Sequence, residues 1–265
     1  MRNNRVVFLS LFSLAILSAI AQLPDDKDLL LWIGEGNGVR ATDATGNKNH
    51  GSLHDGATWV DGRRTGSKAI DLMKNGSFVE IPGVLKAKGT IEFWFKPSWD
   101  GADGNDYRLF DASLKPICFF ITKGADHGDW NNNEFGMMSE DVADANLEVL
   151  TDPAGKIKKM NGFILLLLGN IMKERVEKRH TLYTDGKEWA KQPNVGLYPK
   201  LHPKPRFGHQ TGDYISHTNG AKGLIDNIAI YRKALTPKEI KRDMEASLAV
   251  DADTAVNHGG ELSLT

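Results

Sequence analysis

The sequence lacks disulfide partners, a membrane-spanning apolar run and an excess of positive charge, and each absence excludes a class of protein. Cys118 is the only cysteine among the 265 residues, so no internal disulfide can form. The apolar run FILLLL at Phe163 to Leu168 is far shorter than the roughly 20 residues that span a bilayer. The 33 Lys and Arg residues are balanced by 34 Asp and Glu residues, which leaves no basic footprint for nucleic acid.

Signatures of enzymes and of zinc sites are missing too. The eight histidines do not follow the H-E-x-x-H or H-x-H spacing typical of zinc ligands, and no G-x-S-x-G nucleophile motif is present. The chain also lacks the E-x-D-x-x-E spacing that would hold two carboxylates for glycoside hydrolysis. We therefore expect a non-catalytic protein.

The N-terminal residues have the pattern of a secretory signal peptide. Arg2 and Arg5 precede the apolar run Val6 to Ile16, and Ala19-Ile20-Ala21 forms an A-x-A cleavage site. The run is too short for a membrane anchor, and no cysteine follows the cleavage site to carry a lipid. We predict a signal peptide over 1–21 and a mature chain without an integral membrane span, secreted to the periplasm or the extracellular space.

After residue 21 the sequence is typical of short strands separated by turns. In TIEFWF, at Thr90 to Phe95, apolar and other residues alternate, and TLYTDGKEW, at Thr181 to Trp189, is a hairpin with Asp185-Gly186 at its turn. Other strands are expected at Leu29–Ile33, Ala69–Leu72, Ser77–Ile81, Arg108–Ala112, Ile117–Thr122, Phe135–Met138, Leu147–Leu150, Phe163–Leu168 and Arg206–Gly208. Glu35–Gly62 is expected to be a loop, and Met172–His180 fits a helix or a strand. These segments predict an all-β protein with one domain over 22–248 and a polar tail over 249–265.

The stretch Gly223 to Met244 contains a strand, a turn and a helix. Strict alternation from Leu224 to Tyr231 predicts that Asp226 shares a face with Leu224, Ile228 and Ile230. A carboxylate among aliphatic side chains requires a hydrogen-bond donor, a counter-ion or a metal. Asp226 therefore needs a partner.

A capped helix follows that strand. Thr236 is the predicted N-cap, Pro237 stands at the first helical position and Glu239 completes a capping box. Leu235 and Ile240 fit a hydrophobic staple. We predict a short C-terminal helix docked on a sheet.

This closing stretch, GLIDNIAIYRKALTPKEI, resembles the terminal signature of laminin-G-like jelly rolls of the concanavalin A-like lectin and glucanase superfamily. The opening segment, with Trp32, Glu35, Gly36, Gly38, Asp43, Gly46, Asn47, Asn49 and Gly51, is similar to the pattern W-x-[FL]-[DE]-[ED]-G-x-G followed by D-x-[ST]-G-N-x-N-x-G. Ile33-Gly34 departs from it, and the usual Trp-His pair is missing near Phe163. The resemblance covers Leu29 to Leu248, loosely between Gly124 and Glu177, and implies a two-sheet antiparallel β-sandwich (jelly roll).

Calcium is the cofactor that these residues favour. Asp43, Asn47 and Asn49 offer oxygen atoms in a glycine-containing loop, and Asp226 is the distant acid that such a site requires. The resemblance supports this set, since many members of the superfamily hold calcium with acids from these regions. The alternative is that Asp43 caps a turn and that Asp226 accepts hydrogen bonds from the same loop.

Carbohydrate is the favoured ligand. Trp99 and Trp130 lie in Asp-, Asn- and Gly-rich loops where an aromatic face stacks on a sugar, unless each indole packs beneath its own loop. We predict a secreted, non-catalytic recognition module for a glycan or an extracellular protein, with a structural calcium. The alternatives are a polysaccharide-acting hydrolase or lyase of the same superfamily, and a structural subunit of a surface or matrix assembly.

Overall fold

A computed structural model of the chain describes residues 26–64, 66–86, 88–116, 118–124, 134–140, 148–153, 164–173, 177–193, 201–212 and 219–245. The predicted signal peptide, the polar tail and Trp130 lie outside these residues. Within them, no helix has the length and apolar character needed to cross a membrane.

The described strands are joined by hydrogen bonds into one network that folds into two facing sheets. The first sheet has the order β14-β13-β12-β7-β17-β1, with β5 and β4 beside the start of β17. The second has the order β3-β6-β15-β8-β9-β10-β11, and β2 links β1 to β3. All these pairs are antiparallel, which confirms the predicted β-sandwich.

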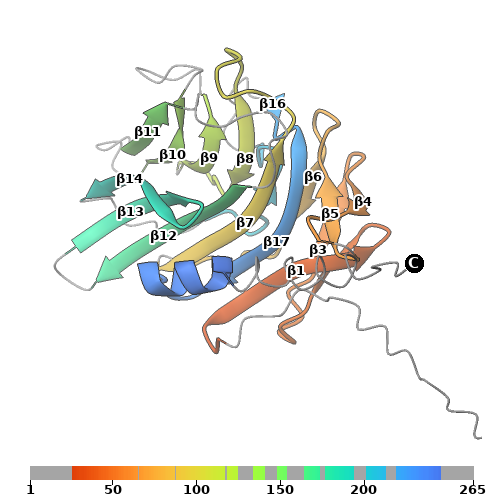
Figure 1. The fold of residues 1–265 in the computed structure, drawn as a ribbon, viewed down its shortest axis with the longest axis horizontal. Helices are drawn as coiled ribbons and strands as arrows, with labels where there is room; N and C mark the ends of the chain where they lie inside the picture. Colours follow the sequence, from red (N-terminus) through yellow and green to blue (C-terminus); the bar gives the residue numbers. More distant parts are fainter. Residues whose placement is uncertain are drawn as a thin grey trace, which may run out of the picture.

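The strands of the first sheet are β1 (Leu29–Asn37), β4 (Thr58–Asp61), β5 (Lys68–Asp71), β7 (Gly89–Pro97), β12 (Ile164–Lys173), β13 (Glu177–Thr184), β14 (Lys187–Pro193) and β17 (Gly223–Tyr231). Those of the second sheet and its links are β2 (Arg40–Asp43), β3 (Gly51–His54), β6 (Phe78–Glu80), β8 (Tyr107–Asp111), β9 (Cys118–Lys123), β10 (Glu134–Glu140), β11 (Glu148–Pro153), β15 (Arg206–Phe207) and β16 (Asn219–Gly220). In Figure 1, β17, β7, β12 and β13 run side by side, and the C-terminal helix lies across one end of them.

The main hydrophobic core lies between the inner faces of the two sheets. Ile91, Phe93 and Phe95 enter it from β7, and Phe110 and Phe119 face them from the second sheet. The three side chains from β7 alternate along their strand because one face of the sheet is buried. This burial explains the alternation of apolar residues in the TIEFWF segment. Cys118, the only cysteine, is buried on β9 and forms no disulfide.

The alternation predicted for β17 is wrong, because the strand contains a β-bulge. Its register against β7 shifts between Asp226 and Ala229, and Asn227 has a positive φ of 49°. Ile225 therefore enters the main core together with Ile228 and Ile230. Asp226 lies opposite Trp94 on the outer face of the sheet, away from those aliphatic side chains.

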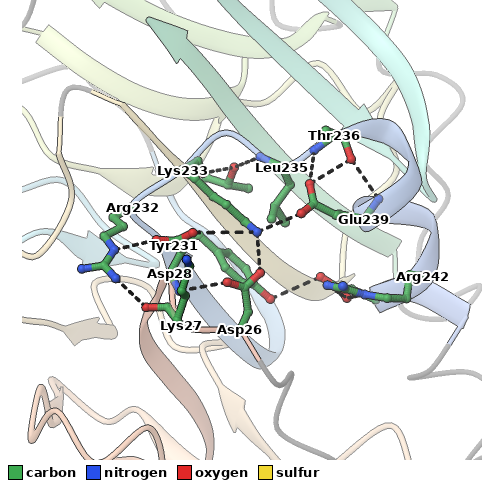
Figure 2. Close-up of polar contacts among 12 residues, drawn as sticks. Asp26, Lys27, Asp28, Tyr231, Arg232, Lys233, Leu235, Thr236, Glu239 and Arg242 are labelled. Carbon is green, nitrogen blue, oxygen red and sulfur yellow. Dashed lines mark hydrogen bonds and ion pairs between the residues drawn. The ribbon is translucent and has the colours of Figure 1, made fainter.

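The helix spans 237–245 and begins at the predicted capping box. The Thr236 backbone N–H donates to Glu239 Oε2 at 2.7 Å, and the Glu239 backbone N–H donates to Thr236 Oγ1 at 3.3 Å. Lys233 connects this box to the beginning of β1, since its Nζ lies 2.8 Å from Glu239 Oε1 and 2.6 Å from Asp26 Oδ2 (Figure 2). These ion pairs tie the first and last described segments together.

The helix covers one end of the outer face of the first sheet. Leu235 and Ile240 are buried there in a second, smaller core with Leu29, Trp32, Tyr183, Ala229 and Tyr231. Glu92 of β7 also faces this side, because its neighbours Ile91 and Phe93 face the main core, and it is 5% exposed. Burial, with a smaller contribution from the nearby Asp243 carboxylate, raises the pKa of Glu92 to about 8.

Two segments differ from the sequence prediction. The expected loop Glu35–Gly62 contains the end of β1 and the strands β2, β3 and β4, which are four residues long and carry many turn-forming residues. The segment Met172–His180, which fitted either a helix or a strand, ends β12 and begins β13. In both places the pairing partner in the sheet, rather than local propensity, decides the structure.

Candidate functional site

The loop that was expected to bind calcium is held together by its own hydrogen bonds. Asp43 is buried, and its carboxylate accepts from the backbone N–H groups of Trp32 (3.1 Å), Thr45 (3.1 Å) and Asn49 (2.9 Å) and from the Thr45 hydroxyl. Burial acts to raise the pKa of Asp43, but these hydrogen bonds outweigh it and the pKa lies below the ordinary value. Both carboxylate oxygens are thus occupied by protein donors.

Asn47 and Asn49 bind the beginning of β1. The Asn49 side-chain amide donates to the Leu30 carbonyl at 2.8 Å, and the Asn47 amide donates to the same oxygen at 3.1 Å and to the Leu29 carbonyl at 3.3 Å. The loop therefore fastens the first strand, in agreement with the structural alternative for Asp43.

Asp226 finds its partner elsewhere. Its Oδ2 accepts from the backbone N–H of Arg63 at 3.1 Å, in the turn that connects β4 to β5. Its Oδ1 is buried without a hydrogen-bond partner among the described residues. Burial raises the pKa of Asp226 to about 6, although the N–H and charge of Arg63 and the charge of Arg64 oppose the shift.

Asn227, which the sequence did not single out, lies beside Asp226 on the bulge. It is 3% exposed, and neither its Oδ1 nor its Nδ2 has a hydrogen-bond partner in the part of the chain that the structure describes. Gly34 of β1 makes room for it, because a Cβ there would lie 2.6 Å from Asn227 Oδ1. The Ile33-Gly34 departure noted in the sequence thus accommodates this amide.

The four residues predicted to bind calcium do not fit one donor set. The oxygens of Asp43 already accept N–H and O–H groups, and no hydrogen bond or ion pair among the described residues joins Asp226 to the 43–51 loop. Within the described part of the chain, two buried oxygens, Asp226 Oδ1 and Asn227 Oδ1, lack hydrogen-bond partners, but the charges of Arg63 and Arg64 oppose a cation beside them. No cluster of three or more His, Cys, Asp or Glu side chains suited to a metal occurs in the described segments.

Trp99 packs beneath its own loop. It is 4% exposed, its ring stacks on Tyr107 with a centroid distance of 4.8 Å, and its Nε1 donates to the Ala221 carbonyl at 2.7 Å. Both the ring and the N–H are therefore used inside the protein, which agrees with the alternative to sugar stacking.

A row of polar residues crosses the outer face of the second sheet. Arg40 on β2 pairs with Ser52 on β3, Ser52 pairs with Glu80 on β6, and Glu80 pairs with Arg206 on β15. Arg206 pairs in turn with Asp111 on β8. Residues that pair directly in a sheet point to the same face. We call these five residues the polar row.

The accessible part of the polar row carries charge. Glu80 lies between two cations, with Lys204 Nζ 2.9 Å from its Oε1 and Arg206 Nη2 3.6 Å from its Oε2. Burial acts to raise the pKa of Glu80, but Lys204 and Arg206 outweigh it, so the pKa is lowered. Arg40 is exposed and forms no ion pair among the described residues.

The other end of the row is closed. Asp111 and Arg108 are fully buried and form an ion pair of 2.6 Å, and the Arg108 guanidinium lies 3.5 Å from the centroid of the Phe120 ring. Asp111 also accepts from the backbone N–H of Ser113 at 2.8 Å and from the Thr211 hydroxyl at 3.4 Å. A ligand can therefore reach the row from Arg40 to Arg206, while Asp111 supports it from within.

An aromatic layer flanks the accessible part. His54 stacks on Phe78 with centroids 4.8 Å apart, and the Arg206 guanidinium lies 4.2 Å from the Phe78 ring. Ser52 Oγ and His54 Nε2 are 2.9 Å apart. Phe78 is 6% exposed, so it supports Arg206 and offers little ring surface to a ligand.

Hydrolysis of a glycosidic bond requires one carboxyl group that is protonated near neutral pH. In the polar row the pKa of Glu80 is lowered, and Asp111 is buried in its ion pair with Arg108. The row can donate and accept hydrogen bonds and attract charge. Its geometry suits recognition better than acid catalysis.

The sequence contained only fragments of this site. Phe78 and Glu80 lie on either side of the fully buried Val79 in a strand that was predicted, but Arg40 and Ser52 were assigned to a loop. Which residues share a row depends on pairing between distant strands, because Glu80 on β6 pairs with Arg206 on β15, which lies 126 positions further along the chain.

A scan against protein-family models and a search of curated proteins give no match. The fold is similar to the receptor binding domain of botulinum neurotoxin D, with 15% identity, a TM-score of 0.63 and coverage of 83% of this chain and 53% of that one. The serotype D ligand binding domain in complex with N-acetylneuraminic acid has 14% identity and a TM-score of 0.62, and the match covers 82% of this chain and 50% of that one. The type G receptor binding domain has 13% identity and a TM-score of 0.59, and the match covers 82% of this chain and 51% of that one. The chain spans about half the length of these domains, and the likeness shows a jelly-roll β-sandwich.

Proposed function

We propose that the protein is a secreted, non-catalytic recognition module that binds a glycan through the polar row. The observation that carries this proposal is the set of half-buried and exposed charged groups, Arg40, Glu80, Lys204 and Arg206, gathered on one outer face of the sandwich. Sugar hydroxyl groups require donors and acceptors side by side, which such a row provides.

The similar solved structures support a binding role. They are receptor or ligand binding domains by their names, and one was solved with an acidic sugar, N-acetylneuraminic acid. Since their identity to this chain is 13–16%, they support the class of function and not a particular ligand. The laminin-G-like assignment and export by the signal peptide belong to the same proposal and rest on the sequence.

Calcium binding remains a separate proposal for the predicted donors Asp43, Asn47, Asn49 and Asp226, of which Asp226 has a carboxylate oxygen without a hydrogen-bond partner among the described residues. Melting curves in chelator and in added calcium test it. Bound calcium would raise the melting temperature of the wild type and not that of Asp226→Asn. In chelator, Asp226→Asn should melt higher than the wild type, because it removes an acid whose pKa is raised to about 6 by burial. Identical wild-type melts in the two buffers would remove calcium from the account.

A glycan array with the exported chain tests the function. We expect the wild type and Lys238→Ala, a change on the exposed helix surface, to bind the same glycans, and Arg206→Ala to lose them. Binding that survives in Arg206→Ala, or an array without any binder, rejects the proposal and favours a protein partner or a structural subunit. Release of reducing ends from the bound glycans favours the enzyme alternative.

A further inference from the structure

We infer that the glycan is acidic, and that its carboxylates are bound by Arg40, Lys204 and Arg206. This inference rests on the proposed function and specifies the class of ligand. It follows from the balance of charge along the accessible part of the polar row, from the absence of an ion-pair partner for Arg40 among the described residues and from the burial of the Phe78 ring.

The accessible part of the row, taken together with Lys204 beside it, has more cations than anions. Arg40, Lys204 and Arg206 carry three positive charges, and Glu80 carries one negative charge. The chain as a whole has a net charge of −1, so this excess is local. A local positive potential attracts anionic ligands and gives no advantage to neutral ones.

The two arginines are placed to bind separate carboxylates. Three strand spacings separate Arg40 on β2 from Arg206 on β15, which corresponds to roughly 14 Å at about 4.8 Å per spacing. Glu80 lies next to Arg206 and Lys204, whereas Arg40 has no ion-pair partner among the described residues. A chain with repeated carboxylates can occupy both positions, and one sugar cannot.

A neutral sugar would have to gain its affinity in another way. Neutral sugars are usually bound by stacking on an aromatic face combined with hydrogen bonds. Phe78, the aromatic ring beside the row, is 6% exposed and lies against both His54 and Arg206. The exposed cations Arg40 and Lys204 are therefore the main groups of this surface that can reach a ligand, and the half-buried Arg206, whose Nη1 donates to the Gln210 carbonyl at 3.0 Å, lies beside them.

Ionic binding of this kind weakens in salt. At 0.1 M salt the screening length is about 10 Å, and at 1 M it is about 3 Å, so cations on an open surface lose much of their attraction. Arg40 and Lys204 are exposed, and we expect the affinity for an acidic glycan to fall at least tenfold between 0.05 and 0.5 M NaCl.

Isothermal titration calorimetry with hyaluronan oligosaccharides and hexagalacturonate tests the inference, with the carboxyl-reduced form of each as its neutral control. We expect the acidic forms of at least one probe to bind and its reduced form to bind at least tenfold more weakly. Arg206→Ala should weaken binding about tenfold or more, and Arg40→Ala about fivefold, with Lys238→Ala unchanged. Arg40 is exposed, so its replacement leaves the fold intact.

Two outcomes overturn the inference and separate it from the proposed function. If acidic and reduced forms bind equally and Arg206→Ala weakens both, the glycan site stands and its preference for acids is wrong. If neither acidic probe binds while the glycan array shows neutral ligands, the acidic class is likewise rejected. If the array shows no glycan at all, the proposed function fails together with the inference.

Discussion

The two outer faces of the sandwich differ in what lies over them. On the first sheet, the helix 237–245 covers Glu92 and the turn between β4 and β5 covers Asp226, and burial raises the pKa of both acids. On the second sheet, Glu80 stays half-buried between Lys204 and Arg206, and its pKa is lowered. On the outer face of the first sheet, which we call the covered face, ionised acids lower the stability. On the outer face of the second sheet, which we call the open face, the charged groups stay ionised and within reach of a ligand.

The largest expected effect is a pH dependence of the unfolding free energy, caused by Glu92 on the covered face of the first sheet. The folded-state pKa of Glu92, about 8, lies above its ordinary value of 4.5, so its contribution to stability is complete below pH 4.5 and is lost as the pH rises to 8. The expected slope is about 1.4 kcal/mol per pH unit. Glu92→Gln should abolish most of it in urea unfolding between pH 6 and 8. An unchanged slope would show that Glu92 is solvated.

Weakening the packing of the helix that covers the first sheet should lower the free energy of unfolding by nearly as much. Ile240 is fully buried in the second core, and Ile240→Ala should lower the free energy of unfolding by about 3 kcal/mol. Glycan binding below the melting transition should stay unchanged, because the helix lies on the other sheet from the polar row. Calorimetry of the variant with a glycan ligand checks this, and a parallel loss of affinity would mean that the two faces are coupled.

The 43–51 loop should matter for stability and not for binding. Asp43→Ala leaves three backbone N–H groups without their acceptor and should lower the free energy of unfolding by about 2 kcal/mol. The measurement is urea unfolding with and without chelator. If chelator destabilised the wild type and had no effect on Asp43→Ala, a metal at Asp43 would replace the hydrogen-bond account.

The smallest effect is expected at the edge of the open face. Lys204 is largely exposed, with 66% of its side chain accessible, so Lys204→Gln should change the unfolding free energy by less than about 0.5 kcal/mol. Its affinity for an acidic glycan should fall about two- to fivefold, mostly at low salt. A loss of stability without a loss of affinity would assign Lys204 to the fold.

The sequence predicted those parts that depend on near neighbours. The capping box of Thr236 and Glu239 forms as expected, because its partners are three residues apart. The Asp185-Gly186 hairpin is also present, with a positive φ at both turn residues, 48° and 72°. Such contacts join residues a few positions apart, so a local pattern is enough to predict them.

Parts that depend on distant partners were missed. The bulge after Asp226 reversed the faces predicted for the second half of β17, because one extra residue shifts the two-residue period. Asp226 was expected to meet the 43–51 loop and instead accepts from Arg63, which no local pattern marks. The polar row requires the register of five strands, so the sequence alone could not bring Arg40 and Arg206 to one face.

The most direct test of the account compares matched pairs of cations on the two faces. Hyaluronan oligosaccharide is titrated into the wild type, into Arg40→Ala/Arg206→Ala on the open face, and into Lys238→Ala/Lys241→Ala on the helix. The account predicts that binding is lost in the first double variant and kept in the second, with both variants folded by circular dichroism. Equal affinity in both, or equal loss in both, would contradict the claim that the open face is the binding site.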